Sequence, residues 1–149
     1  YFTVYGPWGR PDMALFQFTK NILAGEPVRV HNFGNMKRDF TCIDDAVEAT
    51  LRLCSNRIFD KSRPPSFTIV NVASGRPVEL NAFLQLIEQE TGKPALRQEV
   101  EMQAGEVPVT FADLTQLKNL IQWLPETSIE QGVKRFVDWY KGYYDITAS

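Results

Sequence analysis

The chain has 149 residues, a formal net charge of −2 and a hydrophobic content of 44%, which suffices for one domain with a core or for a large part of a bigger domain. No basic excess points to nucleic acid, and no apolar run reaches the roughly 18 residues of a membrane span. With one histidine and two cysteines that lack C-x-x-C spacing, a zinc site is close to excluded. Cys42 and Cys54 are expected as buried thiols. Because no secretory or transit signal is visible, we expect a reducing cytoplasmic setting.

Short strands and helices alternate in the first part of the chain. Hydrophobic periodicity and turn residues predict these elements in order: a strand at 1–5 leading into Gly6-Pro7, a helix capped by Asp12 and ending at Gly25, a strand with a turn at 28–34, a strand at 38–43, and a helix capped by Asp44 and Asp45. Residues 55–66 are polar with two prolines, which is typical of a surface connection.

The second part continues the alternation. The predicted elements are a strand at 67–74, a helix with Leu80, Phe83, Leu84 and Ile87 on one face that ends at Gly92, an edge strand at 95–102, a short helix with Leu117, Leu120 and Ile121, and a last helix opened by a capping box of Thr127 and Glu130. The order indicates an α/β protein. Residues 67–74 are almost continuously apolar, as in a strand covered on both faces of a parallel sheet. Such a strand needs two neighbours, and only residues 1–5 offer one, so the sheet is expected to be larger than this chain.

Four polar residues are candidates for binding chemistry, and each also has a plain structural explanation. Arg38 has two interpretations: it is part of a solvated charge cluster before a strand, or it presents its guanidinium group to a phosphate. His31 is either a ring packed against its neighbours or a flat surface on which a nucleobase stacks. No carboxylate is fixed near it in sequence, so it is a poor candidate for a general base. Glu106 makes turn contacts, or accepts the two hydroxyls of a ribose. Arg10 lies in a turn-rich connection, or contacts a sugar nucleotide.

No complete catalytic motif accompanies these residues. The sequence contains no serine–histidine–acid set, no Walker loop and no G-x-G-x-x-G fingerprint. Taken alone, the residues therefore indicate part of an α/β protein with scattered anion-binding candidates.

Four longer stretches carry a family pattern: "YFTVYGPWGRPDMALFQFTKNIL", "VHNFGNMKRDFTCIDDAVEATLRL", "GEVPVTFAD" and "PETSIEQGVKRFVDWYKGYY". Together they resemble the C-terminal half of the extended short-chain dehydrogenase/reductase enzymes of the NAD-dependent epimerase/dehydratase family. Within that family they look most like the UDP-glucuronate 4-epimerases. The resemblance covers essentially the whole chain in order. The "WGRPDMALF" loop favours the epimerases, whereas "RDF…DD" alone would indicate only the superfamily.

This resemblance implies that residues 1–149 form the C-terminal, substrate-binding portion of a Rossmann-type subunit, with a few strands and helices of its parallel sheet. The N-terminal NAD-binding portion, with the glycine-rich fingerprint and the catalytic Tyr-x-x-x-Lys, would be absent. The parent would be an isomerase of carbohydrate metabolism that moves a hydride from C4 of a UDP-uronate onto NAD and returns it to the other face of the 4-keto sugar. The chain alone is expected to be inactive. The parent is expected to be a homodimer, and the fragment to self-associate.

The resemblance also implies roles for individual residues. Tyr1 and Phe2 match positions beside the nicotinamide, so they are the cofactor-binding candidates. The substrate-binding candidates are Thr3 and Arg10 for anionic groups of the substrate, the backbone around Leu15 and Phe16 for the uracil edge, His31 for stacking on the base, Arg38 for the diphosphate, Gln103 at a position where galactose-type epimerases usually carry an arginine, and Glu106 for the ribose. No catalytic residue and no metal site is assigned to this chain.

Two alternatives stay open at this stage. The chain could belong to a dehydratase, a decarboxylase or a neutral-sugar epimerase of the same family, against which Thr3 and the "WGRPDMA" loop argue. It could also be a free-standing binding module that never had a cofactor domain.

Overall fold

The computed structural model describes residues 1–55 and 68–146. The helices are α1 (Ala14–Ala24), α2 (Ile43–Ser55), α3 (Leu80–Thr91), α4 (Thr115–Ile121) and α5 (Ile129–Tyr143), and a 3-10 turn lies at Asn32–Gly34. The strands are β1 (Val4–Tyr5), β2 (Pro27–His31), β3 (Lys37–Arg38), β4 (Thr41–Cys42), β5 (Val78–Glu79) and β6 (Leu96–Val100). The order confirms the predicted α/β class. Across the described ranges, none of the helices has the length and apolar character needed to cross a membrane.

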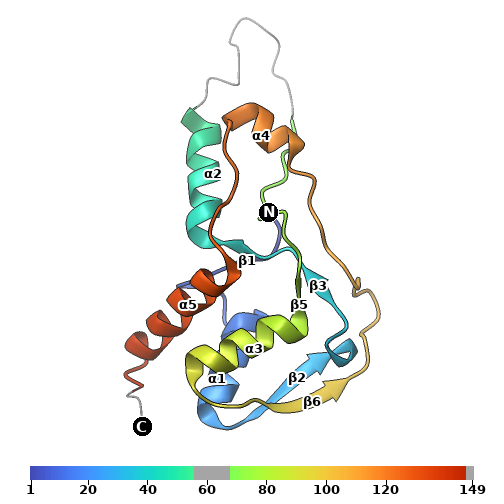
Figure 1. Ribbon diagram of the computed structural model, residues 1–149, viewed down its shortest axis with the longest axis vertical. Coiled ribbons are helices and arrows are strands. Elements are labelled where there is room, and N and C mark those ends of the chain that lie inside the picture. Colours follow the sequence, from blue (N-terminus) through green and yellow to red (C-terminus); the bar gives the residue numbers. More distant parts are fainter. Residues whose placement is uncertain (56–67, 147–149) are drawn as a thin grey trace, which may run out of the picture.

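The strands form three separate pairs. β1 pairs with β4 and β2 with β6, both in parallel, while β3 pairs with β5 in antiparallel orientation. The β2–β6 pair is the longest and runs from Pro27 opposite Leu96 to His31 opposite Val100. Figure 1 shows this pair at one end of an elongated molecule, beside α1 and α3, with α2 and α4 at the other end.

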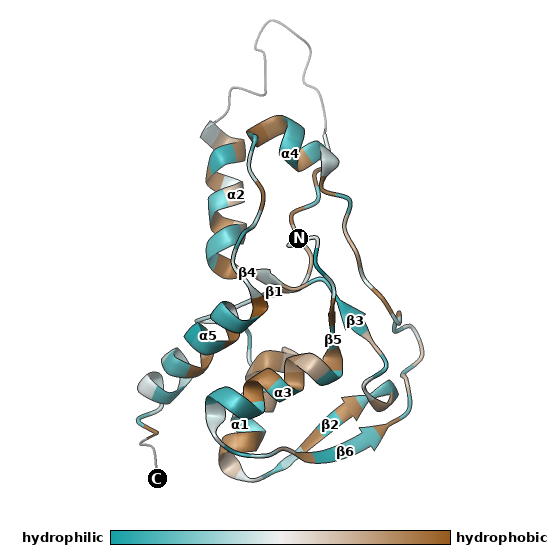
Figure 2. Ribbon diagram, viewed as in Figure 1, coloured by the Kyte–Doolittle hydropathy of each residue, from teal (hydrophilic) through white to brown (hydrophobic). Residues whose placement is uncertain are grey.

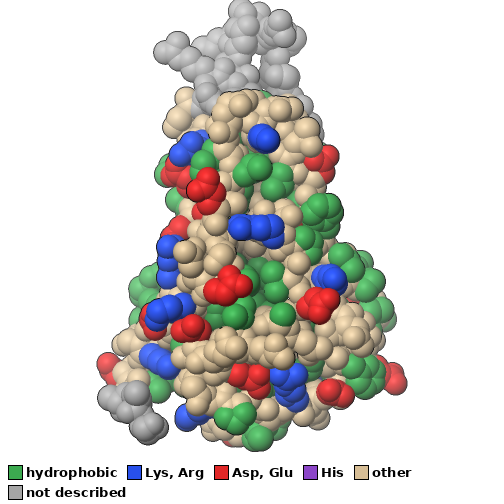
Figure 3. All heavy atoms as spheres, viewed as in Figure 1, with side chains coloured by type: hydrophobic (Ala, Val, Ile, Leu, Met, Phe, Trp, Pro, Cys, Tyr) green, Lys and Arg blue, Asp and Glu red, His purple; other side chains and the backbone are tan. Residues whose placement is uncertain are grey.

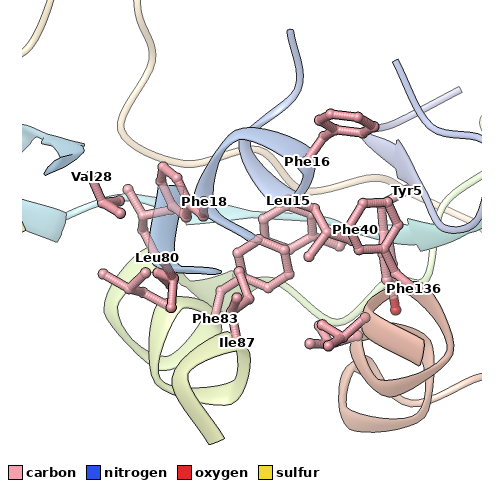
Figure 4. Packing of buried hydrophobic residues seen from close by; sticks show 14 of the residues in the cluster. Tyr5, Leu15, Phe16, Phe18, Val28, Phe40, Leu80, Phe83, Ile87 and Phe136 are labelled. Carbon is pink, nitrogen blue, oxygen red and sulfur yellow. The ribbon is translucent and has the colours of Figure 1, made fainter. Parts of the chain in front are cut away.

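The main core lies where α1, α3 and α5 meet β2. Phe83, Phe136, Val28 and Val30 are almost completely buried there, and the ring of Phe40 stacks on Phe83 with centroids 4.2 Å apart. Figure 2 shows the apolar faces of α1 and α3 turned toward this region, and Figure 4 shows its side chains interdigitating. Burying one such side chain contributes roughly 1.5–3 kcal/mol. A smaller cluster lies under α2 and α4, and its buried members are Ala49, Val72, Leu117 and Ile121.

Helix α1 begins one residue later than a cap at Asp12 requires. Met13 occupies the cap position without a side-chain hydrogen bond, because the Asp12 carboxylate is held by Arg10 instead. The end of the helix is as predicted. Gly25 takes the left-handed conformation at φ 72°, and its N–H bonds the carbonyl of Ile22.

The capping box of α5 is shifted by one residue from the predicted one. The Ser128 hydroxyl accepts from the N–H of Gln131, and the Gln131 side chain accepts from the N–H of Ser128. Thr127 lies outside the box, because its N–H donates to Oδ2 of Asp45 at 3.0 Å. That bond ties the start of α5 to α2 and sets where the helix begins.

Several predicted strands are shorter or absent. Only residues 4–5 of the first strand pair, and the strand expected at 38–43 is divided into β3 and β4. The described part of 67–74 is not a strand: Ile69 is 71% exposed, and one backbone bond joins the Phe2 N–H to the Val72 carbonyl. This single bond does not make a ladder, so these apolar residues lack the two flanking strands that a buried parallel strand would have. The connection expected at 55–66 lies almost entirely outside the described residues. Cys42 is buried as expected, whereas Cys54 is exposed.

Candidate functional site

A cavity of about 540 Å³ lies between α1 and β2. Positions 14, 17, 18 and 21 of α1 line one wall, because residues three and four apart share a helix face. Alternate residues of β2, namely Pro27, Arg29 and His31, line another wall. The intervening Val28 and Val30 point the other way, into the core. The period-2 geometry of the strand thus separates a binding face from a packing face.

Four of the residues singled out in the sequence meet on this cavity: Thr3, His31, Arg38 and Glu106. They come from three parts of the chain: Thr3 near its start, His31 and Arg38 seven residues apart, and Glu106 far beyond them. Their convergence places a hydroxyl, an imidazole, a guanidinium and a carboxylate around one hollow.

The His31 ring and the Glu106 carboxylate lie side by side. His31 Nδ1 and Glu106 Oε2 are 3.4 Å apart, and both side chains are about three-quarters buried. Oε2 also accepts the backbone N–H of Gln103 at 2.8 Å. This second bond fixes the carboxylate, so that Glu106 can offer its remaining acceptor capacity to a ligand.

The Arg38 guanidinium is anchored by the backbone. Its Nη1 donates to the carbonyls of Lys37 at 3.0 Å and Pro108 at 3.3 Å. A guanidinium carries five N–H donors, so further donors remain for an anionic group. The anchoring removes side-chain freedom before any ligand arrives, which favours binding.

The neighbouring Asp39 holds the Arg38 strand in place. Asp39 is completely buried, and its Oδ1 accepts from Ser74 N at 3.0 Å, Ser74 Oγ at 2.8 Å and Gly75 N at 3.1 Å. Its Oδ2 accepts from Gly75 N and Ala112 N, both at 3.2 Å. One carboxylate therefore joins three segments behind the cavity. Sequence analysis missed this role, because nothing local marks an aspartate as an anchor for distant loops.

The other sequence candidates do not line the cavity. Arg10 is exposed and forms a two-point ion pair with Asp12, with Nε–Oδ1 at 3.1 Å and Nη2–Oδ2 at 2.6 Å. The hydrogen bond from Arg10 lowers the pKa of Asp12. Leu15 and Phe16 bury their side chains in the core. Gln103 reaches the site only through its backbone bond to Glu106.

Tyr1 and Phe2 also lie away from this cavity. The Tyr1 hydroxyl and Thr50 Oγ1 are 2.8 Å apart, and Tyr1 lines a second, almost wholly apolar groove of about 300 Å³ with residues of α2 that include Val47 and Leu51. Side chains of Val47 and Leu51 are about half exposed there.

Several polar residues on the cavity were not found from the sequence. They are Asp12, Gln17, Asn21, Arg29 and Gln98. Two signals could have found part of this set. Arg29 stands two residues before His31 and so shares its strand face, and Gln17 and Asn21 are four residues apart on one helix face.

The residues present do not fit an NAD site. The chain has no G-x-G-x-x-G sequence to seat a pyrophosphate against a helix N-terminus, and among the described strands each parallel sheet has only two members. Over the same described ranges, no group of histidine, cysteine or acidic residues is placed to hold a metal. On the face seen in Figure 3, basic and acidic side chains are interspersed.

The fold and the cavity define an α/β protein with a pocket suited to a small polar, anionic ligand. Residues 1–73 match the model described as "NAD dependent epimerase/dehydratase family". The match covers 73 of the 149 residues of the chain.

Relatives of known description align over nearly the whole chain. A "Probable UDP-glucuronate 4-epimerase" of Rhizobium meliloti is 45% identical over 97% of the chain and 46% of its own length. The UDP-glucuronate 4-epimerase of Thermodesulfobacterium geofontis is 38% identical over 100% of the chain and 44% of its own. The crystal structure of UDP-glucuronic acid 4-epimerase from Bacillus cereus, in complex with UDP-glucuronic acid and NAD, matches with a TM-score of 0.86 and 30% identity over 97% of the chain and 44% of that structure. The chain thus spans somewhat less than half of the relatives it matches.

Proposed function

We propose that this chain is the C-terminal, nucleotide-sugar-binding portion of an NAD-dependent UDP-glucuronate 4-epimerase. The observation that carries the proposal is the convergence of Thr3, His31, Arg38 and Glu106 on one cavity. Its volume of about 540 Å³ lies within the range of roughly 300–1,000 Å³ that small-molecule sites occupy. The described relatives of this chain support the choice of substrate class.

The set of groups that lines the cavity suits a nucleoside diphosphate. The base would stack on the His31 ring, and Glu106, held beside that ring, would accept the ribose hydroxyls. Arg38 would donate to the diphosphate, for which guanidinium geometry is well suited. The Thr3 hydroxyl would bind the sugar carboxylate or the diphosphate.

Arg10 can bind the ligand only if its ion pair with Asp12 opens. Its guanidinium is satisfied by Asp12, and Asp12 itself lines the cavity. An anionic ligand would therefore have to exchange with the Asp12 carboxylate before Arg10 could contribute. The exposed pair is weak enough for such an exchange.

The contribution of this chain is to bind and orient the sugar nucleotide. Because its residues do not form an NAD site and the sequence has no Tyr-x-x-x-Lys, we expect binding of UDP-glucuronate without epimerisation. The apolar groove of Tyr1, Val47 and Leu51 would be the surface that the NAD-binding portion covers. In its absence, the same groove would favour self-association.

Calorimetric titration of UDP-glucuronate into the wild-type chain and into Arg38→Met tests the proposal. Loss of a charge-assisted hydrogen bond of about 1.5–3 kcal/mol should raise Kd by about 10- to 150-fold. Arg135→Met is the matched control, because Arg135 pairs with Asp44 on the surface away from the cavity, and its Kd should stay within twofold. A wild-type chain that does not bind UDP-glucuronate, or an Arg38→Met variant that binds it equally well, would contradict the proposal.

A further inference from the structure

The part of the cavity where α1 ends and β2 begins has no ligand contact in the proposed function. Asn21 Nδ2 donates to the Pro27 carbonyl at 2.8 Å and ties the two elements together there. Arg29 follows on the same face of β2, and Gln98 stands opposite Arg29 on β6. All four residues line the cavity. No carboxylate belongs to this group.

Arg29 differs from the other described arginines. Within residues 1–55 and 68–146, each other arginine donates to a carboxylate or a backbone carbonyl, as the bonds of Arg10, Arg38, Arg52, Arg76, Arg97 and Arg135 show. In that same part of the chain, the Arg29 side chain has no hydrogen bond or ion pair. An arginine on a cavity with all its donors unused is available to a ligand rich in acceptors.

The opposite wall offers acceptors. Both amide groups there are already used as donors: Asn21 Nδ2 to Pro27 and Gln17 Nε2 to the Asp12 carbonyl at 3.3 Å. The carbonyl oxygens of these two amides can accept a hydrogen bond, and each amide nitrogen also keeps a second N–H. Donors from Arg29 and acceptors from Asn21 and Gln17 thus stand on two walls of the same space.

The spacing relates this group to the base. Residues two apart on a strand are separated by roughly 6.6–7 Å and point to the same side, so a planar ring lying on His31 has one edge toward Arg29. The long side chain of Arg29 spans the remaining distance. A uracil edge presents an N–H between two carbonyl oxygens, which matches donors from Arg29 and an acceptor from Asn21 or Gln17. Cytosine replaces one of those oxygens with an amino group, which a guanidinium cannot accept.

We infer that Arg29, together with Asn21, is a specificity-determining element that reads the carbonyl edge of the nucleobase and selects uracil over cytosine. The inference rests on the proposed function, because it takes a base to lie on His31. It adds a side-chain contact to a scheme in which the base stacks on His31 and the backbone around Leu15 and Phe16 is expected to meet its edge. A site built to hydrogen-bond one pattern rejects a ligand that leaves its polar groups unpaired.

The test is calorimetric titration of UDP and of CDP into the wild-type chain, Arg29→Met, Arg38→Met and Arg97→Met. Methionine keeps much of the length and removes every donor. Arg97 is the matched control, because it is a β6 arginine that pairs with Glu88 and does not line the cavity. We expect the wild type to bind UDP at least tenfold more tightly than CDP. Arg29→Met should weaken UDP about tenfold, leave CDP within twofold and so abolish the preference, while Arg97→Met keeps it.

The outcomes separate this inference from the proposed function. If the wild type binds neither nucleotide, the proposed function fails and the inference fails with it. If UDP binding is lost in Arg38→Met but the preference for UDP is kept in Arg29→Met, the inference alone is overturned. Equal weakening of UDP and CDP by Arg29→Met would also overturn it, because Arg29 would then act as a general cation. Circular dichroism of each variant confirms that the fold is kept.

Discussion

Replacing Asp39 with asparagine removes the charge that joins three segments behind the cavity. The side chain keeps its shape, but one carboxylate oxygen becomes an amino group. That amino group must face either the Ala112 N–H or the N–H and hydroxyl donors of Ser74 and Gly75, all of which now bond oxygen. At least one hydrogen bond to a charged acceptor is lost, at about 1.5–3 kcal/mol. A buried donor is also left unpaired, at about 1–3 kcal/mol.

We therefore expect Asp39→Asn to lower the free energy of unfolding by about 3 kcal/mol. For a chain of this size, such a loss lowers Tm by about 6–12 °C, at roughly 2–4 °C per kcal/mol. Urea unfolding followed by circular dichroism gives the free energy, and a thermal scan gives Tm. A fully buried anion also carries a desolvation cost, so the measurement decides whether its hydrogen bonds exceed that cost.

Asp113→Asn is the matched control for this experiment. Asp113 is exposed and its Oδ1 accepts one backbone N–H, that of Thr115 at 2.9 Å. Its replacement should lower the urea midpoint far less than Asp39→Asn does, because water can replace the single bond of an exposed carboxylate. If Asp39→Asn and Asp113→Asn unfold at the same urea concentration, the reasoning about the buried carboxylate is wrong.

Two further predictions concern Tyr5. Burial raises the pKa of Tyr5 above its ordinary value of about 10, so the unfolded chain loses this proton before the folded one. The free energy of unfolding should therefore be fully present below about pH 10 and fall as the pH rises further. The urea midpoint should be lower at pH 11 than at pH 9, and this fall should be smaller in Tyr5→Phe. An unchanged midpoint would contradict the assigned burial. Gly132→Ala should lower the free energy of unfolding by about 1–3 kcal/mol, because a methyl group there meets the Tyr5 hydroxyl. The control is Gly142→Ala, which should be neutral or stabilising because a methyl group there has nothing within 4 Å. Equal Tm values for the two variants would refute the close contact.

The helices were predictable because their signals are local. The spacing of Leu80, Phe83, Leu84 and Ile87 predicts the buried face of α3, and Gly92 its end, as the structure confirms. The errors arise where a distant group decides. Thr127 fails as a cap because its N–H is taken by Asp45, far away in the chain.

Strands were less predictable for a related reason. A strand depends on a partner that its own residues do not reveal. The apolar residues of 67–74 predicted a ladder, and the described residues 68–74 do not form one. Likewise, motif reasoning pointed to Arg38 and His31 as site residues but passed over Arg29, which has no motif. Its place on the cavity follows from strand alternation and from the pairing of β2 with β6.

The continuous segment 14–31 supplies both long walls of the cavity, and each of its elements turns a separate face to the core. Val28 and Val30 maintain packing while positions 27, 29 and 31 face the hollow. Substitutions at positions 27, 29 and 31 would therefore change the lining of the hollow while the packed positions Val28 and Val30 stay the same. This helix–strand unit can be exchanged as a whole between related proteins, which would give the cavity a different lining on an unchanged scaffold.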